Sequence, residues 1–268
     1  MKIPRLFACA AVAAFSVTLL AQQAPTGFHA VTCLKIKPDK TSEFRKWAAE
    51  ELHKYAQSRV DSGVVSTYYL LRAVLPTGTS ADCDYLSIAI YPGLPPEPLG
   101  LEELGAALKK AGVSMSGQEY VDRRNSLSTL VSNGMFQNQF YAGSAKKGDY
   151  FDVSYMKASS IDDWLAFEKN VWKPLAEQMI KEGLQTGWSV NLAVMPAGTE
   201  MPYQGVTVDV YPSWDAVFKA QIDPAFIDRF KKVHPDMDPN KTFTDMEKIR
   251  SQTWSRLYVA EDMIASTK

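Results

Sequence analysis

The chain has 268 residues, with 29 basic against 30 acidic residues and a formal net charge of −1. Because neither a basic face nor a long run of like charge stands out, a nucleic-acid partner is not expected. The length and the apolar content of 46% suit one large or two medium globular domains.

The first 21 residues are predicted to be a secretory signal peptide. A short basic start precedes an uncharged apolar run at 6–20 and then the small residue Ala21, which is the layout of an export signal. The run is about 15 residues long, whereas a transmembrane helix needs roughly 20. Cys9 comes too early in it for a lipoprotein site. We expect cleavage near Ala21, a secreted or periplasmic protein of bacterial type, and no membrane contact after cleavage.

The next part of the chain predicts the order strand, helix, strand, strand, helix, strand. Apolar residues at helical spacing mark the first helix, and Gly63 is a typical C-terminal stop. A Pro-Thr-Gly-Thr turn separates the second and third strands. The predicted strands lie at 29–37, 64–74, 85–91 and 135–141, and the predicted helices at 42–59 and 118–131.

The same order is predicted again in the second half. Ser160 and Asp163 form a capping box before an amphipathic helix, and Gly183 ends that helix. Pro174 lies within the apolar stripe and should kink or locally break the helix. The other predicted elements are a strand around 152–154, strands at 184–194, 206–211 and 257–263, and a helix at 244–254.

Part of the sequence is repeated 120 residues later. The segments 73–92 and 193–212 align without a gap and share seven of twenty residues. The shared residues are Ala73, Val74, Pro76, Gly78, Thr79, Tyr91 and Pro92. A duplication is the simplest explanation for this similarity.

The order βαββαβ is that of the ferredoxin-like unit, whose sheet has helices on one side only. Two such units can pack their uncovered faces together. We therefore predict an α+β fold with two ferredoxin-like modules, at 28–142 and 148–264, that form a pseudo-dimeric α/β barrel around a cavity. No oligomeric state of the whole chain is predicted.

This arrangement resembles the dimeric α/β-barrel superfamily, which includes antibiotic-biosynthesis-monooxygenase-like and NIPSNAP-like proteins. The resemblance covers nearly all of the chain after residue 21 and rests on element order and repeat, without a family motif. It implies one of several activities: cofactor-free monooxygenase, isomerase, haem-binding enzyme, or none. No catalytic set of those families maps onto this chain.

Alternation along the strands separates the side chains into two faces. We expect Leu86, Ile88 and Ile90, with their counterparts Val206, Val208 and Val210, to pack beneath the helices. The opposite face would then meet the cavity. The residues predicted there are Ser87, Tyr91, Asp152, Ser154, Asn191, Asp209 and Tyr211.

Asp209 is the predicted general base, with Asn191 as its partner. A carboxylate in a partly dry cavity has a raised pKa and can accept a proton or a hydrogen bond. The other predicted cavity residues, Ser87, Tyr91, Asp152, Ser154 and Tyr211, would contact a ligand. The alternative for Asp209 is an exposed carboxylate at the barrel mouth that water satisfies.

Cysteine and histidine give little sign of redox or metal chemistry. Cys33 and Cys83 follow the predicted cleavage site, and export permits a disulfide between them. Their counterparts at the 120-residue offset, Val153 and Tyr203, are not cysteines, so buried free thiols are expected. The three histidines lack metal-ligand spacing, and no nucleotide-binding glycine motif is found, so neither a metal nor a cofactor is predicted.

Three functions remain open on the sequence. The first is a secreted protein that binds a small, partly apolar molecule in the barrel. The second is a cofactor-independent monooxygenase or isomerase acting on an aromatic substrate through Asp209. The third is a non-catalytic structural or interaction module with a filled barrel.

Overall fold

The computed structural model describes residues 27–266, so the signal peptide predicted at 1–21 lies outside the described residues. The first half of the described chain follows the predicted order. Its strands are β1 (Phe28–Ile36), β2 (Thr67–Leu75), β3 (Tyr85–Tyr91) and β4 (Ser128–Gly143). Its helices are α1 (Thr41–Trp47), α2 (His53–Asp61), α3 (Leu101–Lys110) and α4 (Gly117–Leu127), with a π-helical segment at Ala48–Leu52 and a 3₁₀ turn at Gly78–Ser80.

The second half repeats this order with one additional helix. Its strands are β5 (Tyr150–Ala158), β6 (Gly187–Met195), β7 (Gly205–Tyr211) and β8 (Arg250–Ala265). Its helices are α5 (Ile161–Phe167), α6 (Lys173–Lys181), α7 (Trp214–Gln221), α8 (Phe226–Val233) and α9 (Pro239–Ile249), with a π-helical segment at Glu168–Trp172.

Local sequence signals explain how the first helix of each half begins and ends. Ser160 Oγ accepts a hydrogen bond from the Asp163 backbone N–H at 3.3 Å, as the capping box predicts. Gly63 and Gly183 both have φ of +75°, the left-handed conformation that ends a helix. A π-helical segment interrupts the helix just before Pro174, but the first half has the same interruption without a proline. The break therefore belongs to the repeat and is not caused by Pro174.

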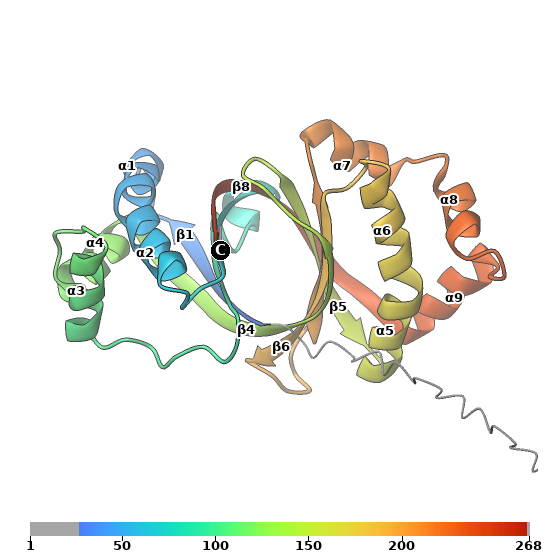
Figure 1. The fold of residues 1–268 in the computed structure, drawn as a ribbon, viewed down its shortest axis with the longest axis horizontal. Coiled ribbons are helices and arrows are strands. Elements are labelled where there is room, and N and C mark those ends of the chain that lie inside the picture. The colour runs from blue at the N-terminus through green and yellow to red at the C-terminus, as the bar shows by residue number, and fades with distance from the viewer. Residues whose placement is uncertain (1–26, 267–268) are drawn as a thin grey trace, which may run out of the picture.

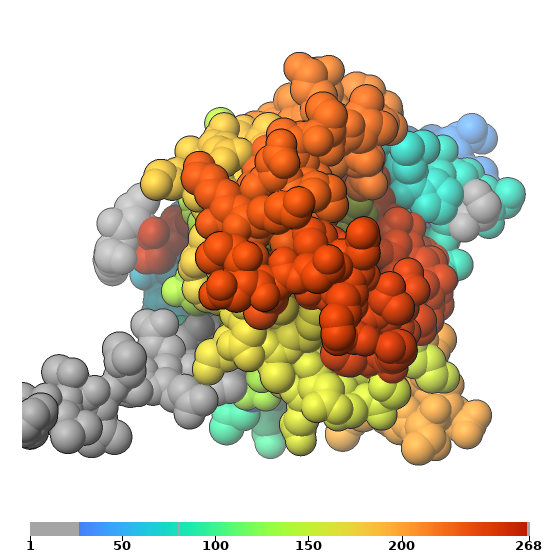
Figure 2. All heavy atoms as spheres, turned by 90° about the vertical axis from the view of Figure 1, so that its right-hand side faces the viewer, coloured from blue at the N-terminus to red at the C-terminus, as the bar shows by residue number. Residues whose placement is uncertain are grey.

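The eight strands of the described chain form one closed antiparallel barrel in the order β1-β3-β2-β8-β5-β7-β6-β4. Helices α1–α4 lie on one side of the barrel and α5–α9 on the other (Figure 1). Figure 2 shows the side of the second half, where atoms in the yellow to orange-red range that includes α5 to α9 face the viewer. The fold is thus the predicted α+β barrel of two ferredoxin-like halves.

Two long strands hold the halves together. β4 pairs with β1 of its own half and with β6 of the other, and β8 likewise pairs with β5 and β2. Each has 16 residues, more than the sequence predicts, because each reaches from one half into the other. The predicted helices at 118–131 and 244–254 are therefore too long, since residues 128–131 and 250–254 already belong to β4 and β8.

The core has three layers. Phe44, Trp47 and Tyr85 belong to the layer between the first-half helices and the sheet. Trp164 and Trp188 belong to the corresponding layer of the second half. The third cluster lies inside the barrel, and its members come from both halves, so the barrel interior joins the halves into one core.

Candidate ligand-binding cavity and buried acid pair

The barrel surrounds a cavity of about 900 Å³. The inward positions of the strands are largely apolar and include Val31, Leu86, Ile88, Val153, Val206 and Val208. This volume is in the range of pockets that bury a small organic molecule, and walls of this kind favour an apolar one.

The prediction of which strand face meets the cavity was wrong. Leu86, Ile88 and Ile90 line the cavity together with Val206, Val208 and Val210, whereas they were expected beneath the helices. The reason is that the strands of the two halves face each other across the closed barrel and contribute an apolar core there. The layer beneath the helices, by contrast, contains several partnered polar groups.

The structure separates the predicted site residues into two places. Asn191 contributes to the cavity wall. Tyr91 borders the wall at the end of β3, but its ring packs in the helix-facing layer, where Arg59 Nη2 of α2 donates to the Tyr91 hydroxyl at 2.9 Å. The remaining five lie on the helix-facing side of the sheet: Ser87, Asp152, Ser154, Asp209 and Tyr211. Asp209 and Asn191 are thus on opposite faces and do not form a pair.

A cluster of uncharged polar groups lies in the cavity wall. We call it the inner polar patch, and it is formed by His29, Asn138, Ser189 and Asn191. Asn138 Nδ2 donates to Asn191 Oδ1 at 3.0 Å, and Asn191 Nδ2 donates to Ser189 Oγ at 3.1 Å. His29 lies on the neighbouring strand, and burial lowers its pKa to about 4. Its imidazole is therefore neutral near pH 7.

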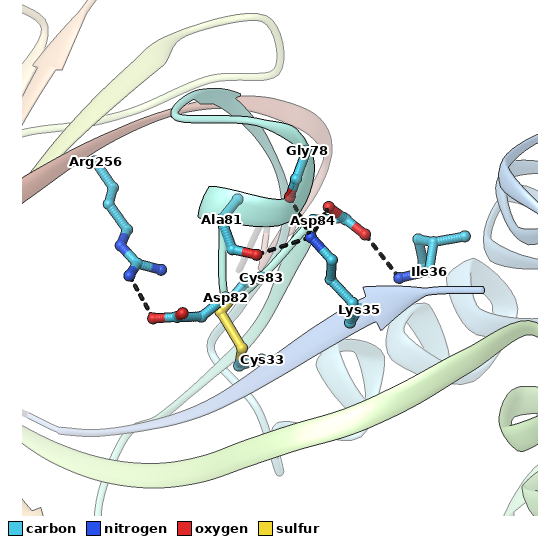
Figure 3. Close-up of a disulfide and its surroundings, with 9 residues drawn as sticks. All are labelled: Cys33, Lys35, Ile36, Gly78, Ala81, Asp82, Cys83, Asp84 and Arg256. Atoms are coloured by element: carbon cyan, nitrogen blue, oxygen red, sulfur yellow. Dashed lines mark hydrogen bonds and ion pairs between the residues drawn. A yellow bond between two sulfur atoms is a disulfide. The ribbon is translucent and has the colours of Figure 1, made fainter. Parts of the chain in front are cut away.

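Asp82 and Cys83 of the β2–β3 loop line one end of the cavity, and several contacts hold this loop to β1 (Figure 3). Lys35 Nζ donates to the carbonyl oxygens of Gly78 and Ala81, both at 2.7 Å, and contacts Asp84 Oδ1 at 3.0 Å. Asp82 of the same loop forms an ion pair with Arg256 of β8. We call this the disulfide end because Cys33 and Cys83 are also bonded here.

The disulfide contradicts the prediction of free thiols. The Cα atoms of Cys33 and Cys83 are 5.2 Å apart, within the usual range for a disulfide. Cys33 lies opposite Leu86 of β3 in the ladder, and Cys83 comes two residues before that strand begins. The pairing is local to the first half, so cysteines are not required at the repeat-related positions.

An aromatic contact takes the place of the disulfide in the second half. Cys33 lies opposite Leu86 in the first half, and Tyr155 lies opposite Val206, the counterpart of Leu86, in the second. The structural counterpart of Cys33 is therefore Tyr155, and not Val153 as the 120-residue offset suggests. The Tyr155 ring lies 4.8 Å from that of Tyr203, the counterpart of Cys83. Both loops that approach this end are thus attached to the first strand of their own half.

Two carboxylates form a pair beneath the helices of the second half. Asp152 on β5 lies directly opposite Asp209 on β7. Gln185 Nε2 donates to Asp209 Oδ1 at 2.8 Å. Burial, followed by the charge of Asp152, raises the pKa of Asp209 to about 7. Burial also raises the pKa of Asp152, so the pair holds a proton in mildly acidic solution.

A buried ion pair lies in the same layer. Glu168, on the π-helical segment, is 1% exposed and lies 3.0 Å from Arg250 Nε. Trp164 Nε1 donates to Glu168 Oε1 at 2.7 Å. These contacts give both charges a partner, which a buried charge requires.

Sequence reasoning missed His29, Asn138 and Arg256 as cavity residues. The available signal was strand alternation. His29 is two residues from Val31, and Arg256 is two residues from Tyr258, so each shares a strand face with a residue of the barrel interior. Asn138 gave no such signal because β4 has a bulge beside it, which disturbs the alternation.

Comparison with known proteins places the fold. The structure is similar to that of a protein named "putative monooxygenase" from Lactobacillus acidophilus, with a TM-score of 0.54 and 12% identity over 90% of this chain and 96% of that one. It is equally similar to a protein of the same name from Fusobacterium nucleatum subsp. nucleatum, with a TM-score of 0.54 and 9% identity over 90% and 94%. The chain has the dimeric α+β-barrel fold.

Sequence comparisons add nothing to this likeness. No family model matches the chain, and no curated protein matches its sequence. Within residues 27–266, no helix has the length and apolar character needed to cross a bilayer. No group of three or more histidine, cysteine, aspartate or glutamate side chains in that range is placed to hold a metal ion.

Proposed function

We propose that the barrel binds a small, largely apolar molecule. The observation that carries this proposal is the 900 Å³ cavity with its largely apolar wall. An interior of this size also argues against a module whose barrel is filled by its own side chains.

The test is titration with the neutral fluorescent dye N-phenyl-1-naphthylamine. The native protein should bind the dye with saturable enhancement of fluorescence. Val208→Trp fills the cavity and should weaken binding at least about tenfold, or about 1.4 kcal/mol. Val194→Trp is the matched control, because Val194 lies outside the cavity wall on the same sheet. Equal binding by both variants would contradict the proposal.

We further propose that the protein is exported to the periplasm or secreted. The sequence of the first 21 residues and the Cys33–Cys83 disulfide support this, because disulfides persist in oxidising compartments. Expression of the full chain in a bacterium should give a periplasmic or extracellular protein whose N-terminus begins near residue 22. An uncleaved protein confined to the cytoplasm would contradict export.

A second candidate function is cofactor-independent monooxygenase or isomerase chemistry on an aromatic substrate. The acid pair favours it, since a carboxylate with a pKa near 7 can accept and return a proton at neutral pH. Because both carboxylates lie on the helix-facing side of the sheet, the substrate would have to reach them beneath the second-half helices and not from the barrel cavity. Asp209 would act as the base, and the charge of Asp152 would help to keep its pKa near 7. If turnover is found, Asp209→Asn should lower it by at least about a hundredfold. Unchanged turnover would exclude Asp209 as the base.

A further inference from the structure

We propose that the inner polar patch binds an uncharged carbonyl or hydroxyl group of the ligand, and that the ligand is an uncharged aromatic carbonyl compound or phenol. This inference rests on the proposed function, because it concerns the same cavity. It adds the chemical class of the ligand and the end of the ligand that the protein recognises.

The patch is a single area of the cavity wall. Asn138 of β4 and Asn191 of β6 are direct partners in the strand ladder. β4 pairs with β6 along one edge and with β1 along the other. In the pairing with β1, His29 lies opposite Phe136. Asn138 is two residues after Phe136 on β4, so its side chain is on the same face of the sheet as His29. Diagonal neighbours of this kind are about 7–8 Å apart between Cα atoms. A single oxygen or hydroxyl group can therefore lie between the imidazole and the amides.

The patch has hydrogen-bonding capacity that the described part of the protein does not use. Asn138 Nδ2 donates to Asn191 Oδ1 and to the Phe140 and Val190 carbonyls, whereas Asn138 Oδ1 accepts no hydrogen bond from residues 27–266. The His29 imidazole has no hydrogen-bond or ion-pair partner among residues 27–266. Both residues line the cavity, so a ligand or water inside it can form hydrogen bonds with these groups.

Because the inner polar patch carries no charge, it favours an uncharged polar group of the ligand over an ionised one. The Asn138, Ser189 and Asn191 side chains carry no charge, and burial keeps His29 neutral near pH 7. An ionised carboxylate or ammonium placed there would lose its hydration without gaining an opposite charge. Among the described lining residues Arg256 carries the only guanidinium, and it is already paired with Asp82 at the disulfide end.

Aromatic rings fit a planar ligand body, one beside the patch on β4 and two across the barrel from it on β2 and β5. Phe136 is the cross-strand neighbour of His29. Tyr69 and Phe151 meet edge to face at 5.5 Å between ring centroids, and all three side chains contribute to the wall. Aromatic surfaces of this kind pack well against a flat ring system in offset or edge-to-face geometry.

The experiment compares three probes of similar size in competition with N-phenyl-1-naphthylamine. Naphthalene lacks a polar group, 2-acetylnaphthalene carries a neutral carbonyl, and 2-naphthoate carries a negative charge. In the native protein, 2-acetylnaphthalene should bind about tenfold more tightly than naphthalene, as expected for a hydrogen bond worth about 1.4 kcal/mol. 2-Naphthoate should bind most weakly of the three.

Two histidine variants make the test specific. His29→Phe keeps a ring in the wall and removes the hydrogen-bonding nitrogens, so naphthalene and 2-acetylnaphthalene should bind within about threefold of each other. His53→Phe is the matched control, because His53 lies on α2 outside the barrel cavity, and it should keep the tenfold preference. Circular dichroism of both variants checks that they fold.

The outcomes separate this inference from the proposed function. If none of the three probes displaces the dye, ligand binding in the barrel is itself contradicted, and this inference falls with it. If naphthalene binds but the carbonyl preference is missing, or survives in His29→Phe, the inference alone is wrong. Tightest binding of 2-naphthoate, lost in Arg256→Gln, would overturn it in favour of an anion site at the disulfide end.

Discussion

Asp209 and Asp152 are held side by side at a cost to the folded state. Their strands place them directly opposite each other, and the protein around them disfavours two negative charges. Hydrophobic residues of similar size would pack there without this penalty. Strongly perturbed carboxylates are common at functional sites, which is the reason for keeping Asp209 as a candidate base.

This cost predicts how stability depends on pH. The pKa of Asp209 is about 7 in the folded protein and about 4 in the unfolded chain, so only the folded state holds the proton between these values. The free energy of unfolding should therefore fall by up to about 4 kcal/mol as the pH rises from 4 to 7.

Asp209→Asn should remove most of that slope and raise stability at pH 8, as measured by urea unfolding at several pH values. Asp228→Asn, at an exposed position on α8, serves as the control and should keep the native slope. A native slope that persists in Asp209→Asn would show that Asp209 is not the group responsible.

The residue-scale predictions failed where they depended on strand face. Alternation correctly grouped Ile88 with Val208 and Ser87 with Asp209, but it does not say which group faces inward. The more polar face was expected to meet the cavity, but it lies beneath the helices. There Gln185 donates to Asp209, and Arg250 pairs with Glu168. Those partners are distant in sequence, so alternation alone does not reveal them.

At the scale of elements, the two halves attach equivalent loops by different means. The β2–β3 loop is held by the Cys33–Cys83 bond and by Lys35, whereas the β6–β7 loop depends on the contact of Tyr203 with Tyr155. A covalent link restricts the unfolded chain as well as the loop, and a ring contact does not.

Replacing both cysteines by serine should therefore destabilise the protein by about 2–4 kcal/mol, given the 50-residue separation of the pair. Urea unfolding measures the loss, and amide hydrogen exchange should speed up at residues 76–84 much more than at 196–204. The native protein treated with a reductant provides the comparison. Unchanged exchange at residues 76–84 would contradict the role of the disulfide in holding this loop.

Most elements were predictable because turn residues and helix caps act locally. Gly63, Gly183 and Ser160 end or begin helices as their types suggest. The ends of α4 and α9 were not predictable, because residues 128–131 and 250–254 become strand only through pairing with β1 and β5. Tertiary pairing overrides helical spacing there.

At the scale of the whole molecule, the duplication explains the closed barrel. The repeat at 73–92 and 193–212 was visible in the sequence, and so was the one-sided helical cover of each half. What the sequence does not show is that β4 and β8 each cross into the other half and close the sheet. Closure creates the cavity, so the proposed ligand site belongs to both halves together.

The most direct test of this account is methyl NMR of the valine-labelled protein during titration with 2-acetylnaphthalene. The account predicts saturable shifts at the cavity-facing methyls of Val31 and Val208, with little change at Val190 and Val217, which lie in the layer between the sheet and the helices. Shifts at Val190 and Val217 without shifts at Val31 and Val208 would place the ligand outside the barrel and contradict the central claim.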